Sequence, residues 1–174
     1  MSDDRLENMC YKVTKSFEQL RENEIGIEYH PLKRSYASLA ISKESNTFRM
    51  IVGNLFFELP EEEREAAIAH ELGHYIRLRG RGDRNKGLMK KLNIEFMNYS
   101  LSGIAKSDLR AERLMRRVKL SEYDADKKAV EAGYGPQLLS LLKNLVIKHG
   151  SNKSMDSLMQ RIKTLEDKLK QGGE

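Results

Sequence analysis

The clearest chemistry in this chain lies in one short motif, His70-Glu71-Leu72-Gly73-His74, which has the pattern H-E-x-x-H. Residues four apart in a helix lie about 40° apart around the axis and one turn along it, so both imidazoles can reach one point. Such a pair suits a zinc ion, and a glutamate beside the first ligand can accept a proton from a water on the metal. The motif predicts His70 and His74 as metal ligands and Glu71 as a catalytic general base.

The two histidines could also be ordinary polar residues on a partly exposed helix without a metal. The residues just before the motif, Ala66-Ala67-Ile68-Ala69, are small and apolar and predict a buried helix. An imidazole buried without a partner is costly, so burial favours the metal site.

A catalytic zinc ion needs a third protein ligand and an open position for water. The best candidates are Glu122 and Asp126, which are four apart and therefore share one helix face. One carboxylate can bind the metal while the other accepts the free N–H of a ligating imidazole. The pair could instead be a solvated acidic patch near a helix start.

The HELGH motif, followed by EYDADKKAVEAGYGP, resembles the gluzincin metallopeptidases of the HtpX and CAAX-prenyl-protease type. The similarity runs over about residues 51–165 and includes the lead-in FFELPEEEREAAIAHELGH and the pair Arg161-Ile162. The best-known members are embedded in membranes, and this chain is more similar to the small soluble versions called minigluzincins.

The resemblance implies a zincin-type peptidase with one catalytic Zn²⁺ bound by His70, His74 and Glu122. It implies Glu71 as general base and Asp126 as the residue that orients a ligating histidine. Family members bind an extended peptide along the edge of their sheet, which implies substrate contacts here at four positions: Tyr36, Ala37, Ser38 and Leu39.

The chain also departs from the family pattern. Met155 stands where a histidine often precedes the Arg-Ile pair by six residues, and the strand lacks the asparagine usual beside the active site. The sequence therefore does not identify the residue that would stabilise the oxyanion formed during peptide hydrolysis. Arg161, Tyr134 and His149 are the candidates, in that order, and for each a structural role is favoured over a catalytic one.

The order of helical and strand patterns along the chain predicts an α+β fold, mainly helical, with a small three-stranded sheet near the N-terminus. Hydrophobic periodicity changes along the chain from helical to strand spacing and back again. We expect one domain, 1–174, with a helix in 1–23, strands in 25–53, the motif helix at 60–79, helices at 88–99, 107–132 and 138–147, and a last helix at 154–171. The 107–132 stretch could be one helix or two helices that meet at Ser121.

Composition supports a soluble globular chain, with 39% hydrophobic and 33% charged residues over 174 positions. The longest apolar stretch, 50–59, is interrupted by polar residues, so no integral membrane segment is expected. The first residues, MSDDRLENM, do not form a secretory signal, and the single cysteine fits a reducing compartment. We therefore expect a cytoplasmic protein.

Cys10 could occupy a fourth zinc position, but its spacing favours a buried thiol on a helix face.

Positive charge gathers in residues 77–119, which hold thirteen Lys and Arg against four Asp and Glu. Such a segment could rest on an anionic membrane surface or attract an acidic partner, or it could be a solvated helix face. The few aromatic residues among these charges argue against nucleic acid.

Three functions follow. The first is a zinc endopeptidase that acts on a peptide or protein substrate. The second is a repressor-cleaving regulatory protease, against which the E-x-x-x-D pattern and the lack of a DNA-binding helix pair argue. The third is a regulatory or latent zinc-binding protein whose basic surface binds an acidic partner, nucleic acid or a membrane.

Overall fold

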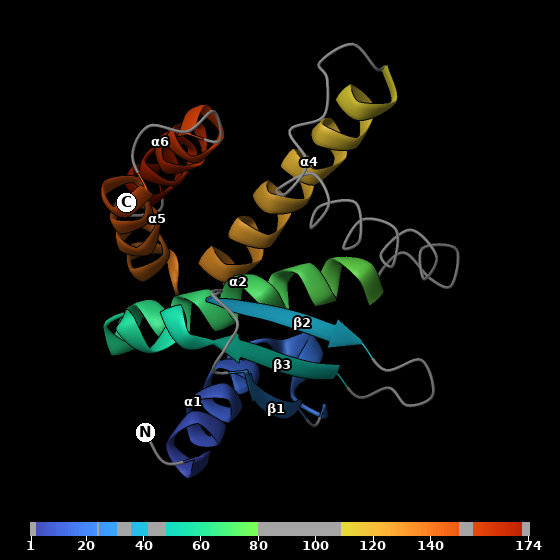
Figure 1. The fold of residues 1–174 in the computed structure, drawn as a ribbon, viewed down its shortest axis with the longest axis vertical. Helices are drawn as coiled ribbons and strands as arrows, with labels where there is room; N and C mark the ends of the chain where they lie inside the picture. Colours follow the sequence, from blue (N-terminus) through green and yellow to red (C-terminus); the bar gives the residue numbers. More distant parts are fainter. Residues whose placement is uncertain are drawn as a thin grey trace.

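The computed structural model describes residues 3–23, 25–30, 36–41, 48–79, 109–149 and 155–171. Its fold is α+β and mostly helical, with one small sheet near the N-terminus, as the sequence predicts (Figure 1). The helices and strands, in chain order, are α1 (Asp3–Lys15), β1 (Ile25–His30), β2 (Ala37–Ile41), β3 (Phe48–Gly53), α2 (Glu61–Arg79), α4 (Leu109–Glu131), α5 (Gly135–His149) and α6 (Met155–Gln171). Short 3-10 turns span Glu18–Leu20 and Asn54–Glu58.

Helix α2 occupies the middle of the molecule. The sheet and α1 lie on one side of it, and α4, α5 and α6 lie on the other (Figure 1). Pro60 precedes the helix and three glutamates fill its first turn, which suits the positive end of the helix dipole. After this first turn the helix is buried on several sides, and its buried residues are small or apolar, including Ala66, Ile68, Ala69 and Leu72.

The first turn of α2 is tied to α5 by a buried carboxylate. Glu63 is 4% exposed, and its Oε1 accepts hydrogen bonds from Oγ of Ser140, at 2.8 Å, and from Nδ2 of Asn144. Because both donors lie on α5, Glu63 links α5 to the start of the motif helix.

The sheet has the order β1-β3-β2, with β1 parallel and β2 antiparallel to β3. Ala37 pairs with Val52 and Ile41 with Phe48, so β2 is bonded to β3 along its whole length. Strand β2 is an edge strand of this sheet and is the strand that packs alongside α2.

The N-terminal helix is shorter than the sequence suggests. The sequence predicts a helix in 1–23, but α1 ends at Lys15, and Phe17 has extended backbone angles. The hydroxyl of Ser16 donates to the carbonyl of Val13 at 2.6 Å, which satisfies a carbonyl that another helical turn would have used. Leu20 still reaches the core, fully buried, from the 3-10 turn that follows.

Helix α1 packs on α2 through apolar contacts and two ion pairs at its surface, Arg5 with Glu61 and Lys12 with Glu65. Cys10 lies in this core and is 1% exposed, and burial raises the pKa of its thiol to about 12. It is therefore a buried thiol on the helix face and not part of a group of metal-binding side chains among the described residues.

The C-terminal half is a set of long helices. Helix α4 continues through Ser121, so the stretch that could have been two helices is one. It ends at a turn where Gly133 adopts a φ of 94°, a left-handed conformation in which glycine is favoured. None of the helices described here combines the length and apolar character that crossing a bilayer requires. The helix expected at 88–99 and most of the basic segment lie in 80–108, outside the described residues.

Candidate metal centre

Helices α2 and α4 bring His70, His74 and Glu122 together, with one potential ligand atom from each residue within 4.8 Å of the others. The Nε2 atoms of the two histidines lie 3.1 Å apart. One oxygen of Glu122 lies 3.3 Å from Nε2 of His70, and the other lies 3.3 Å from Nε2 of His74. The three predicted ligands therefore converge, although Glu122 comes from a separate helix.

The spacing of these atoms fits a small tetrahedral ion. In a tetrahedral site with bonds of about 2.0–2.1 Å, neighbouring ligand atoms lie about 3.3–3.4 Å apart. The 3.1 Å between the two Nε2 atoms is close to this edge length, and Glu122 presents a different oxygen to each imidazole at 3.3 Å. Two imidazoles and one carboxylate suit several divalent transition metals, zinc among them.

Each imidazole is held from behind by α4. Nδ1 of His70 lies 2.9 Å from Oδ1 of Asp126, in a close ion-pair contact rather than a well-aligned hydrogen bond. Nδ1 of His74 lies 3.1 Å from Oγ of Ser121. Contacts on both Nδ1 atoms direct both Nε2 atoms toward Glu122, which is the orientation that a metal requires.

Asp126 thus lies where the E-x-x-x-D pattern predicts, whereas Ser121 was not recognised from the sequence as part of the site. Its position directly before Glu122 was the available signal for a role in the site. Consecutive residues of a helix lie about 100° apart around its axis, so both can border the same neighbouring helix. That signal is weak without knowledge of which side of α4 faces His74.

Arg161 of α6 holds both carboxylates of α4. Its Nε and Nη2 donate to the two oxygens of Asp126, at 2.7 and 2.6 Å, and its Nη1 donates to Oε2 of Glu122 at 2.8 Å. The residue is 8% exposed. Such a bidentate, charge-assisted arrangement is strong and directional, so α6 contributes to the placement of Glu122.

The charges of the site favour a bound cation. Burial alone would lower the pKa of His70, but the carboxylates of Asp126 and Glu122 outweigh it and raise this pKa to about 10. Burial opposes ionisation of Glu122, yet contacts with His70 and His74 hold its pKa well below the usual value. Carboxylates that stabilise the positive charge of a protonated imidazole would also stabilise the positive charge of a metal ion bound to the neutral imidazole.

Glu71 lies among the same groups. Burial raises the pKa of its carboxyl, and the neighbouring His74 and His70 counteract part of that increase. A glutamate in such a setting is suited to proton transfer near neutral pH.

The two helices meet backbone to backbone next to the site. A Cβ atom placed on Gly73 would lie 2.6 Å from the carbonyl oxygen of Ala125 and 2.9 Å from its Cα. Only a glycine permits α2 and α4 to approach so closely, one residue before His74. The motif pattern H-E-x-x-H leaves this position open, so its role was not predicted.

The predicted substrate residues lie in and just before β2. The carbonyl of Tyr36 accepts a hydrogen bond from the amide of Gly53 at 3.0 Å, which joins it to β3. Burial, with Glu58 and Glu63 nearby, raises the pKa of Tyr36. Ala37 and Ser38 are partly buried on the edge strand, and the side chain of Leu39 lies outside the described part.

Of the other two candidates for oxyanion stabilisation, Tyr134 lies away from the cluster, beside the N-terminal segment. Tyr134 is buried at the start of α5, where burial raises the pKa of its hydroxyl and Ser16 of the N-terminal segment is its hydrogen-bond partner. The side chains of His149 and Met155 lie outside the described part of the chain. An oxyanion role for Arg161 stays a prediction.

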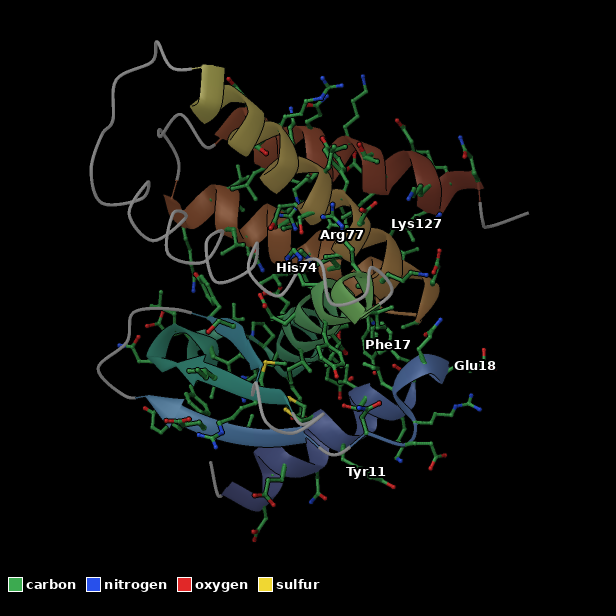
Figure 2. All side chains as sticks on the ribbon, turned by 90° about the vertical axis from the view of Figure 1, so that its right-hand side faces the viewer. Tyr11, Phe17, Glu18, His74, Arg77 and Lys127 are labelled. Atoms are coloured by element: carbon green, nitrogen blue, oxygen red, sulfur yellow. The ribbon has the colours of Figure 1, made fainter. Side chains whose placement is uncertain are left out.

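Figure 2 shows His74 and Arg77 of α2 beneath α4, whereas Tyr11, Phe17 and Glu18 lie on the opposite side of α2. The N-terminal helix therefore packs behind the metal cluster and not over it. Arg77, at the start of the basic segment, pairs with Asp124 of α4 at 3.0 Å. This ion pair is a further link between the two helices that form the site.

Comparison of the chain with protein-family models finds no match, and comparison with curated proteins finds none either.

Proposed function

We propose that this protein is a zinc-dependent endopeptidase. The observation that carries the proposal is the convergence of His70, His74 and Glu122 at distances suited to a tetrahedral ion, with Glu71 beside them. A bound zinc ion would polarise a peptide carbonyl and acidify the attacking water. Three protein ligands leave a fourth position open, which distinguishes a catalytic zinc site from a structural one.

The residues of the chain then have separate tasks. Glu71 accepts the proton of the attacking water and transfers it to the departing amine. Asp126 holds His70 through Nδ1, and Arg161 holds Asp126 and Glu122 in register. Each contact restricts a ligand to one orientation before the metal arrives, which reduces the reorganisation that binding requires.

We propose that the substrate is an extended peptide that adds to the outer edge of β2 at residues 36–39. An added strand gains main-chain hydrogen bonds whatever its sequence, so it suits cleavage of unfolded or flexible segments. The position of β2 at the sheet edge, next to the motif helix, supports this arrangement.

We also propose that the protein resides in a reducing compartment such as the cytosol, which the buried free thiol of Cys10 supports.

Metal content and peptidase activity of purified variants test the proposal together. We expect about one zinc per wild-type chain and much less in Glu122→Ala. Glu71→Gln should retain zinc and lose cleavage of casein or a peptide library, because the general base is lost and the ligands remain. Glu62→Gln, the same change at an exposed position of the same helix, is the matched control.

Cleavage by Glu71→Gln at the wild-type rate would refute the mechanism. Zinc retained without any cleavage by the wild type would favour the regulatory or latent zinc-binding alternative, in which the basic segment 77–119 binds an acidic partner, nucleic acid or a membrane surface. Absence of zinc after reconstitution would refute the metal site itself.

A further inference from the structure

The two histidines of the cluster have different partners on the same helix. His70 faces the carboxylate of Asp126, whereas His74 faces the hydroxyl of Ser121, with 3.1 Å between Nδ1 and Oγ. Ser121 directly precedes Glu122, so three positions within residues 121–126 of α4 supply one ligand and a contact to each imidazole. We propose that Ser121 is a positioning residue that sets the tautomer and the ring orientation of His74.

A neutral imidazole carries one N–H, and only the nitrogen without it can bind a metal. The hydroxyl of Ser121 can accept a hydrogen bond from Nδ1–H of His74, which leaves the lone pair of Nε2 directed at the cluster. The side chain of His74 is only 17% exposed, so little water is available to replace the hydroxyl. Loss of this contact would leave the ring free to rotate or to change tautomer.

The contact belongs to the face of α4 that packs on α2. Ser121 and Ala125 are four apart, hence one turn apart on the same face, and Ala125 touches the backbone at Gly73. Close packing one residue before His74 restricts how far Ser121 can move from its imidazole. The serine is therefore held at hydrogen-bonding distance by the helix crossing itself.

The size of the effect follows from the type of acceptor. Hydrogen bonds to a charged acceptor are roughly twice as strong as those between neutral groups. Loss of an outer contact to a metal ligand typically lowers metal affinity about 10- to 100-fold. Because Ser121 is neutral, we expect a loss of about tenfold for Ser121→Ala, at the lower end of that range.

The inference rests on the proposed metal site, and the experiment separates the two. Zinc affinity is measured by competition with a chromogenic chelator for the wild type, Ser121→Ala and Ser121→Thr, with Ser157→Ala of α6 as the control. Thermal unfolding without metal verifies that each variant folds. The visible spectrum of the Co²⁺-loaded proteins reports the ligand geometry, and long-range ¹H–¹⁵N spectra report the tautomer of His74.

We expect Ser121→Ala to bind zinc about tenfold more weakly with an altered Co²⁺ spectrum, and Ser121→Thr to restore both. Wild-type affinity and spectrum in Ser121→Ala would overturn the role of Ser121 while the metal site stands. Equal weakening in Ser121→Thr would overturn it too, because the hydroxyl would then not be the relevant group. A wild-type chain that binds no zinc would overturn the proposed function and this inference together.

Discussion

Replacement of Gly73 by alanine tests whether the α2–α4 contact sets the geometry of the metal centre. In most helix interiors this change is stabilising, since alanine is favoured over glycine by about 0.8–1.0 kcal/mol. Here the added Cβ would meet the carbonyl oxygen of Ala125 at 2.6 Å and its Cα at 2.9 Å. We therefore expect the opposite sign.

The magnitude follows from the distances. An ordinary contact needs about 3.5 Å, so the helices must separate by roughly 0.6–0.9 Å at this point. Overpacking of this kind costs about 3 kcal/mol when backbone atoms lie on both sides and neither can rotate away. After the gain in helix propensity, a net loss of about 2 kcal/mol remains, which lowers Tm by roughly 4–8 °C in a chain of this size. The same displacement exceeds the tolerance of a site whose ligand atoms lie 3.1–3.3 Å apart.

The assay compares Gly73→Ala with the wild type in urea unfolding, thermal unfolding and zinc affinity. Gly26→Ala in β1 is the matched control, because a Cβ there lies 3.6 Å from Cγ of Arg49, an ordinary contact. We expect this control to keep or slightly raise stability. If Gly73→Ala proved as stable as the wild type and bound zinc equally well, the argument that close helix approach positions the ligands would be refuted.

Two further predictions concern buried groups outside the site. Glu63→Ala should lower the free energy of unfolding by about 1–3 kcal/mol, because the donors of Ser140 and Asn144 lose their shared acceptor. Urea midpoints check this, with the exposed Glu62→Ala as control, and coincident midpoints would contradict it. For Cys10, burial raises the thiol pKa from 9.0 to about 12. Its contribution to stability is therefore complete below pH 9 and falls as the pH rises toward 12, so thermal unfolding of the wild type should lose stability there relative to Cys10→Ala, and parallel pH curves would refute the shift.

Local patterns predicted most elements but not all of their ends. Pro60 and the glutamates after it correctly predicted the start of α2, because capping and dipole effects act within one turn. The apolar spacing that continues to Leu20 did not reveal that α1 ends at Lys15. A buried residue can reach the core from a 3-10 turn as well as from a helix, so burial periodicity alone cannot locate the last helical residue.

The sequence did not predict how the strands pair within the sheet. Three short strands could be recognised, but the order β1-β3-β2 and the parallel pairing of β1 with β3 depend on how the chain crosses over the core. The order matters for function, because it leaves β2 at an edge next to the motif helix. Alternation of apolar residues predicts a strand, but not its neighbours.

The part of the candidate site that lies within each helix could be predicted from the amino-acid sequence. Four-residue spacing in a helix obliges His70 and His74 to share a face, and the same spacing places Glu122 and Asp126 together. That these two faces meet is known only from the folded structure, with Arg161 behind the carboxylates, Ser121 behind His74 and nitrogen–oxygen distances of 3.3 Å. The physical reason is that spacing within one helix follows from backbone geometry, whereas contact between helices distant in sequence depends on packing, and here on the space left by a single glycine.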